Sequence, residues 1–261
     1  MDLFKYTKLS WQSVAGSFIL SLGLTSSSAY SYSLKSGHFK SSVNYKGQNL
    51  KVSWGAYQPS KKNSGMLVYF HGDGGGGGYL NSLKSLKKVA DDYGLHAVAV
   101  KAPVSHSWQG PIDTNNQKHP YPNAQAFDEF LFDYISRYSV DRNKVFFSGV
   151  SGGAMYISGH YIPKYGRNIK GGMILLCGGA TSAEYIDQKN AAFYNSKGFS
   201  KGFSVYQYIS KDDHLFMYAE DAKKDYSALG HPYKTVWPAS GGHCGFPIFK
   251  TMKEGLSWMI K

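Results

Sequence analysis

The sequence predicts an α/β protein with a mostly parallel central sheet, helices on both faces and an antiparallel N-terminal edge. Short, nearly continuous apolar runs indicate strands that are buried on both faces. These runs alternate with segments whose apolar residues recur every three or four positions, as in amphipathic helices. Strands that alternate with helices favour right-handed crossovers and therefore a parallel sheet.

The first expected strands lie between about Gly37 and Tyr57 and precede any helix, so we expect them to pair antiparallel at one edge. The expected strands are Leu50–Tyr57, Met66–Phe70, His96–Val100, Lys144–Phe147, Met173–Leu176, Ser204–Ile209 and Tyr233–Trp237. Apolar stripes predict helices over Tyr79–Tyr93, Phe127–Tyr138, Leu215–Leu229 and Phe249–Met259. Gly94 ends the first of these helices and Gly230 ends the third.

Composition excludes several classes of protein. The chain has 261 residues, enough for one large domain that needs no metal or disulfide framework to fold. Two cysteines are too few for a disulfide scaffold or a four-thiolate zinc site. No apolar run is long enough to cross a bilayer. The net charge is +12, but the lysines are scattered, so we expect a basic surface and no nucleic-acid partner.

The N-terminus has the layout of a secretory signal. Lys5 and Lys8 precede the apolar stretch Val14–Leu24, and the small residues Ser27, Ser28 and Ala29 follow it. We therefore expect residues 1–29 to be removed, leaving one domain over 30–261 in the periplasm or outside the cell. No nucleotide or nicotinamide cofactor is expected there.

A run of glycines follows the expected strand Met66–Phe70 and fits two motifs. Gly72, Gly74 and Gly77 match a dinucleotide fingerprint, but the next strand ends without the carboxylate that binds the ribose. The better interpretation is that His71–Gly75 forms an oxyanion loop, whose amides stabilise negative charge on a carbonyl oxygen. His71 is then an anchor for the loop and not a base.

The segment Gly149-Val150-Ser151-Gly152-Gly153 has the G-x-S-x-G pattern between an expected strand and an expected helix. That context is typical of a nucleophile elbow, a sharp turn that needs small neighbours on both sides of the serine. Ser151 is therefore the candidate nucleophile.

A serine nucleophile needs a base, and the base needs a carboxylate to orient it. In this architecture the acid and then the histidine follow the serine along the chain. His243 lies in a glycine-rich loop between the last strand and the last helix, where the base is expected. Asp213 is the preferred acid because it is nearer to the apolar start of the next helix; Asp212 is the alternative.

Around these residues the sequence resembles the secreted α/β-hydrolase esterases related to polyhydroxybutyrate depolymerases and to feruloyl or acetylxylan esterases. The resemblance rests on Tyr138–Val145 followed by Gly149–Met155, on Tyr69–Gly72 and on Gly242–Cys244, and covers about residues 64–250. It implies an α/β-hydrolase fold and serine esterase chemistry without metal or cofactor. The glycine run is longer than is usual in this family.

The resemblance and the elbow together predict a mechanism. Ser151 attacks an ester carbonyl, His243 accepts its proton, and Asp213 orients the imidazole. The amide of Gly152 is the inner oxyanion donor, and that of Asp73 is the expected outer donor, with Gly74 as the alternative. A serine peptidase or thioesterase with the same triad remains an alternative function, as does a catalytically dead protein that binds the cell envelope or a polymer.

Two further expectations concern the edge of the sheet where the strands end. Trp108 and the aromatic residues of Thr181–Gly202 follow strands, so we expect them to line the substrate entrance, unless they only close the core. Cys177 and Cys244 both lie at that edge, and we expect a disulfide between them; two buried free thiols are the alternative.

Overall fold

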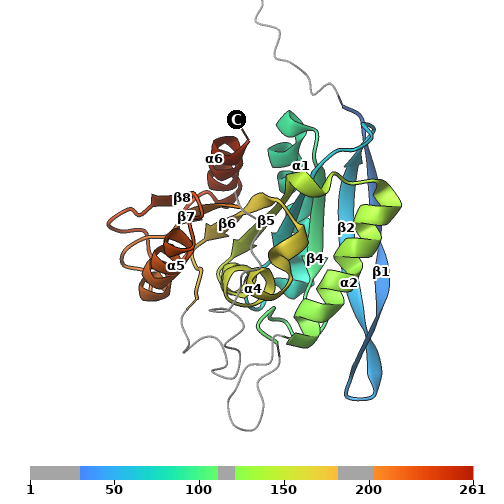
Figure 1. Ribbon diagram of the computed structural model, residues 1–261, viewed down its shortest axis with the longest axis horizontal. Coiled ribbons are helices and arrows are strands. Elements are labelled where there is room, and N and C mark those ends of the chain that lie inside the picture. The colour runs from blue at the N-terminus through green and yellow to red at the C-terminus, as the bar shows by residue number, and fades with distance from the viewer. Residues whose placement is uncertain (1–29, 111–120, 182–202, 261) are drawn as a thin grey trace, which may run out of the picture.

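The computed structural model describes residues 30–110, 121–181 and 203–260. Their strands form one eight-stranded sheet in the order β1-β2-β4-β3-β5-β6-β7-β8 (Figure 1). The strands are β1 (Tyr32–Tyr45), β2 (Gln48–Pro59), β3 (Met66–Phe70), β4 (His96–Lys101), β5 (Val145–Val150), β6 (Gly171–Leu176), β7 (Ser204–Tyr208) and β8 (Tyr233–Val236). The helices are α1 (Leu83–Ala90), α2 (Tyr121–Tyr138), α3 (Gly152–Tyr156), α4 (Ile162–Tyr165), α5 (Phe216–Ala228) and α6 (Ile248–Met259).

The predicted mostly parallel sheet with an antiparallel N-terminal edge is confirmed. β1 pairs antiparallel with β2, and β2 pairs antiparallel with β4, whereas β4, β3, β5, β6, β7 and β8 are parallel neighbours. The edge strand β1 begins at Tyr32, earlier than predicted, and its register shifts between Lys40 and Asn44.

Two expected helices differ from the prediction. The glycine run forms a 3₁₀ segment, Gly75–Ser82, so that α1 begins only at Leu83. Glycine supplies no side chains for an apolar stripe and has a low helix propensity, which explains the late start. The helix after Ser151 is interrupted by a π turn over Ile157–Tyr161 between α3 and α4.

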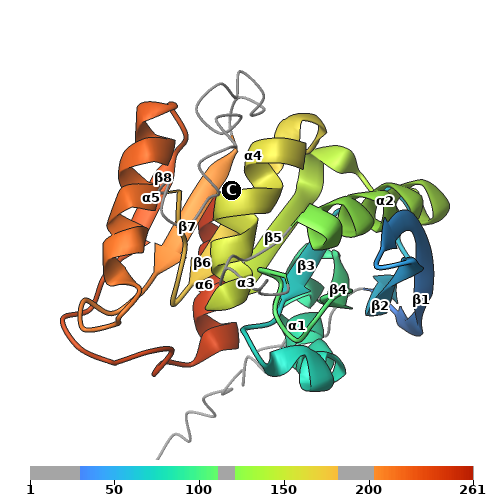
Figure 2. The same cartoon turned by 90° about the horizontal axis from the view of Figure 1, so that it is seen from below.

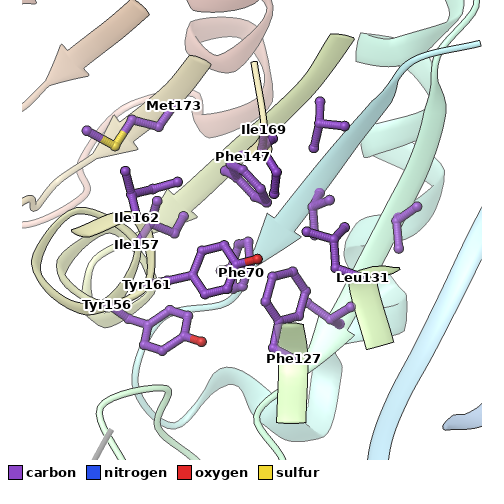
Figure 3. Packing of buried hydrophobic residues seen from close by; sticks show 14 of the residues in the cluster. Phe70, Phe127, Leu131, Phe147, Tyr156, Ile157, Tyr161, Ile162, Ile169 and Met173 are labelled. Atoms are coloured by element: carbon purple, nitrogen blue, oxygen red, sulfur yellow. The ribbon is translucent and has the colours of Figure 1, made fainter. Parts of the chain in front are cut away.

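Alternate residues of each central strand face opposite layers of the core. In β3, Val68 and Phe70 contact the layer formed by α2, α3, α4 and α5, whereas Leu67 and Tyr69 contact the layer formed by α1 and α6. This alternation places helices on both faces of the sheet (Figure 2). Phe70 lies in the middle of the larger layer, among aromatic rings from α2 and the segment α3–α4 (Figure 3).

Several predictions fall on residues that the structure does not describe. The expected signal, residues 1–29, lies outside the described residues, and so do residues 111–120 and 182–202 of the two long loops. Among the described helices, none has the length and apolarity needed to cross a membrane.

His96 begins β4 and is buried with 4% of its surface exposed. Its Nδ1 lies 3.1 Å from the hydroxyl of Tyr134 on α2. Burial disfavours the charged imidazolium and lowers the pKa of His96 to about 4.

The depressed pKa of His96 predicts a loss of stability in acid. Between pH 6.5 and pH 4 the unfolded chain binds a proton that folded His96 does not, so the free energy of unfolding falls as the pH falls. The full shift corresponds to about 3 kcal/mol. We expect the protein with His96→Gln to lose less stability between pH 7 and pH 4, measured by urea unfolding. Parallel pH profiles for the two proteins would contradict this assignment.

Candidate active site

Ser151 lies in a sharp turn between β5 and α3. Its backbone has φ 51° and ψ −119°, a conformation that a residue with a side chain rarely adopts. Hydrogen bonds hold the turn on both sides: the amide of Ser151 donates to Leu176 O over 2.9 Å, and the amide of Met155 donates to Ser151 O over 3.0 Å. The predicted strand–turn–helix context around Ser151 is therefore present.

Two glycines allow the turn to be this tight. A Cβ on Gly149 would lie 2.5 Å from the amide nitrogen of Ala154, and a Cβ on Gly153 would lie 2.5 Å from Phe70 O. Both contacts are with backbone, which cannot move aside. The elbow therefore requires glycine at both positions, and it brings the start of α3 against the end of β3.

The structure brings together the three side chains that the sequence analysis selected. Ser151 Oγ lies 2.9 Å from His243 Nε2, and His243 Nδ1 lies 3.0 and 2.9 Å from the two carboxylate oxygens of Asp213. The Asp213 side chain has no exposed surface, whereas 34% of the His243 side chain is exposed. The result is a hydrogen-bonded chain from a buried carboxylate to a hydroxyl near the surface.

The loop that carries His243 is held by two separate attachments. The carboxylate of Asp212 accepts hydrogen bonds from the amides of Gly241 (3.2 Å) and Gly242 (2.9 Å). On the other side of His243, Cys244 forms a disulfide with Cys177, with 5.2 Å between the Cα atoms. The predicted disulfide is therefore present. Asp212, considered as an alternative acid, binds the backbone of this loop, whereas the carboxylate bonded to the His243 imidazole is that of Asp213.

The glycine run wraps around the ring of His71. Burial lowers the pKa of His71, so the ring is neutral at neutral pH. Its Nδ1 donates to Gly72 O (2.8 Å), and its Nε2 accepts from the Ala102 amide (3.2 Å). A Cβ on Gly76 would lie 3.4 Å from this ring. His71 is the loop anchor that the sequence predicted.

The amides of the same loop differ in their hydrogen bonds. Gly74 donates to His106 O over 3.1 Å, and Gly75 donates to Gly72 O over 3.0 Å. Gly74, the alternative outer donor, therefore already has a backbone acceptor. Gly152 is the first residue of α3, where an amide has no acceptor within the helix.

The carboxylate of Asp73 lies directly over Gly152, a contact that the sequence did not reveal. Asp73 accepts hydrogen bonds from Ser107 Oγ (2.5 Å) and Gln109 Nε2 (3.0 Å). A Cβ on Gly152 would overlap the carboxylate of Asp73. The side chain of Asp73 thus closes the space next to the nucleophile turn, and the loop after β4 fixes its position.

The expectation that Trp108 lines the substrate entrance is wrong. Trp108 has no exposed surface, and its ring packs 4.9 Å from that of Phe70 and 5.1 Å from that of Tyr156. The side-chain amide of Asn123 on α2 donates from Nδ2 to Trp108 O (3.3 Å) and so holds this loop residue toward the core. Trp108 therefore closes the core. The aromatic residues expected from 182–202 lie outside the described residues.

A second imidazole also faces the buried carboxylate. Nδ1 of His214 lies 3.4 Å from Asp213 Oδ1, and its ring centroid lies 4.6 Å from that of His243. The side chain of His214 is 69% exposed. Its position next to Asp213 in the chain is the one signal that could have drawn attention to it.

Comparisons with known proteins identify the fold. No protein-family model and no curated protein matches the sequence. The fluorophosphonate-binding serine hydrolase F of Staphylococcus aureus is similar in structure, with a TM-score of 0.59 and 16% identity over 88% of this chain and 99% of that one. A feruloyl esterase module from Clostridium thermocellum has a TM-score of 0.58 and 14% identity over 87% of this chain and 88% of that one. An esterase from Pyrobaculum calidifontis has a TM-score of 0.57 and 16% identity over 87% and 81%. This protein therefore has the α/β-hydrolase fold.

The contact between Asp73 and Gly152 predicts a coupled pair. Gly152→Ala should destabilise the protein by about 1–3 kcal/mol because the new methyl group meets a carboxylate that is held in place. In a protein with Asp73→Ala the same substitution should lose much less stability. Denaturant unfolding of the two single variants and the double variant measures the coupling.

Gly77→Ala is the matched control, because a Cβ at Gly77 would have nothing within 4 Å. We expect it to leave the free energy of unfolding nearly unchanged. Equal losses from Gly152→Ala in both backgrounds would contradict the predicted contact.

Proposed function

We propose that this protein is a serine hydrolase that cleaves carboxylic esters through an acyl-enzyme. The observation that carries the proposal is the hydrogen-bonded chain from Asp213 through His243 to Ser151, with the serine on a strained turn. A serine hydroxyl is a weak nucleophile until a neighbouring base takes its proton, and this geometry supplies such a base.

In the proposed first step, Ser151 Oγ attacks the ester carbonyl while its proton passes to His243 Nε2, over the 2.9 Å that separate these atoms. Asp213 keeps the other ring proton on Nδ1 and stabilises the imidazolium that forms. His243 then donates its proton to the leaving alcohol. Water then attacks the acyl-enzyme carbonyl while His243 accepts its proton. His243 returns this proton to Ser151 Oγ as the carboxylic acid is released.

We assign the amides of Gly152 and Asp73 to the oxyanion hole. The hydrogen bond from Gly74 to His106 O supports Asp73 as the outer donor, because it engages the competing amide. The bonds from Ser107 and Gln109 to the Asp73 side chain fix the loop before substrate arrives. Donors held in place in this way need no reorganisation during the reaction.

The compartment and the substrate class are further parts of the proposal. Residues 1–29 have the layout of a secretory signal, and the disulfide between Cys177 and Cys244 fits an oxidising compartment. The similar structures include a feruloyl esterase module, a carboxylesterase and an arylesterase. Feruloyl or acetyl esters, or a polyester such as polyhydroxybutyrate, are therefore the substrates to test first.

A substrate panel distinguishes the related activities. It consists of p-nitrophenyl esters of rising chain length, then feruloyl and acetylated-sugar esters, a polyester, and matched amides and thioesters. Hydrolysis of the esters well above that of the amides and thioesters is the expected result. Preferential cleavage of the amides would indicate a serine peptidase, and no turnover of any compound would indicate a binding protein.

The nucleophile assignment predicts the effect of Ser151→Ala. This substitution should lower kcat for a p-nitrophenyl ester by roughly 10³–10⁶-fold, because no other group forms the acyl-enzyme. The thermal midpoint should change little. Ser36→Ala, on the exposed surface of β1, is the control and should keep full activity. Near-normal hydrolysis by the Ser151→Ala protein would exclude the proposed mechanism.

The acid assignment predicts different effects for two neighbouring residues. Asp213→Asn should reduce kcat by about 10⁴-fold, because an amide favours the wrong imidazole tautomer. Asp212→Asn keeps one oxygen acceptor for the loop amides and should cause a loss of about tenfold or less, which corresponds to roughly 1.4 kcal/mol. Steady-state kinetics on one ester substrate measures both effects. A larger loss for Asp212→Asn would reverse the assignment.

A further inference from the structure

His214 is an exposed imidazole beside the proposed base, and the mechanism above gives it no role. Its Nδ1 and that of His243 both face the carboxylate of Asp213, at 3.4 Å and 3.0 Å from Oδ1. The potential ligand atoms of the three residues all lie within 4.8 Å of one another. Two imidazoles, one of them largely exposed, therefore lie close to one buried carboxylate.

This set of atoms has the chemistry that Zn²⁺ prefers. Zinc binds imidazole nitrogen and carboxylate oxygen at about 2.0–2.2 Å in tetrahedral geometry, which places ligand atoms roughly 3.3–3.6 Å apart. The two distances to Asp213 Oδ1 already lie near this range. The side chain of His214 is 69% exposed and can turn without disturbing the core. Three protein ligands leave a fourth position for water.

The surroundings of the three residues favour metal binding. The side chain of Asp213 has no exposed surface, and its Oδ1 also accepts a hydrogen bond from the amide of Leu215 (2.9 Å). This bond orients the carboxylate before an ion arrives, as outer hydrogen bonds do in metal sites. His243 is held by its loop attachments, so the exposed His214 is the ligand with the most freedom to adjust.

We propose that Asp213, His214 and His243 form a binding site for Zn²⁺, and that the bound ion inhibits the esterase. The inhibitory part rests on the function proposed above; the binding part does not.

The inhibition follows from where the imidazole proton must go. In the active arrangement His243 carries its proton on Nδ1, toward Asp213, and Nε2 accepts from Ser151. Zinc binds through a lone pair, which Nδ1 has only after it gives up its proton; that proton is released to solvent, and Nε2 takes one up from solvent. The single proton of the neutral ring then resides on Nε2, from which it donates to Ser151 Oγ. The nitrogen that should accept the serine proton has no free lone pair, and no nucleophile forms.

Zinc binding is tested without relying on activity. Purified protein with Ser151→Ala is titrated with ZnCl₂ in an isothermal calorimeter. MgCl₂ is the control salt, because imidazole binds Mg²⁺ poorly. We expect one saturable site for zinc and none for magnesium. Adding His214→Ala should weaken zinc binding by about tenfold or more. His38→Ala, an exposed histidine on β1, should leave it unchanged.

The inhibitory role is tested on the protein with Ser151 intact. Zinc should inhibit ester hydrolysis, a chelator should restore it, and His214→Ala should raise the half-inhibitory zinc concentration about tenfold or more. Absence of saturable zinc binding, or equal affinity with and without His214, would overturn the site. Zinc binding that depends on His214 but leaves ester hydrolysis unaffected would overturn the inhibitory role. Zinc binding that depends on His214 in a protein without esterase activity would support the site and refute the proposed function.

Discussion

The backbone conformation of Ser151 is the constraint on which the rest of the site depends. A side-chain-bearing residue with φ 51° stores about 1–3 kcal/mol of strain, which persists only where its surroundings enforce it. The enforcement comes from β5 and α3, which approach each other so closely that Gly149 and Gly153 leave no room for a Cβ. The same approach presses α3 against the end of β3. One tight turn therefore positions the serine, the amide of Gly152 and the glycine-rich loop together.

The remaining groups reach the serine because of the strand order. β5 lies between β3 and β6, and β7 follows β6. These strands are parallel, so the segments that follow them meet at the carboxyl ends of the strands. The loop after β3 carries Asp73, the residue after β6 is Cys177, and the loop after β7 carries Asp213. The last loop, with His243, is then attached to two of these neighbours through Asp212 and the disulfide. A glycine-rich segment thereby holds an imidazole in a defined orientation.

The sequence predicted the parts of the structure that depend on local pattern. Met66–Phe70 was predicted with the bounds that the structure has, because a continuous apolar run in a buried strand admits few other interpretations. The candidates Ser151, Asp213 and His243 followed from motif and chain order. α2 was expected only from Phe127, whereas it begins at Tyr121. Its first turn carries buried Asn123, which binds loop carbonyls and adds nothing to an apolar stripe.

Other features depend on which loops meet in space, and the sequence did not reveal them. Asp73 contacts Gly152 while Ser107 and Gln109, in the loop after β4, hold its carboxylate through hydrogen bonds. Trp108 lies in a loop at the expected edge, but the direction of a loop side chain follows from contacts such as the bond from Asn123. Asp212 and Asp213 are adjacent in the chain and take opposite roles, because one faces the loop backbone and the other faces the imidazole.

Among the described residues, β1 and β8 are the outermost strands of the sheet, and this has a consequence for how the molecules behave in a crowded solution. A strand with unpaired backbone groups invites a strand from another molecule, which leads to aggregation. On β1 the exposed lysines Lys35 and Lys40 oppose such pairing, because a second copy would bring like charges together. The register shift after Lys40 also bends β1 away from the flat shape that a second strand could pair with.

On the opposite side of the sheet, β8 has only four residues and carries exposed Lys234. These features of β1 and β8 therefore oppose strand-to-strand self-association.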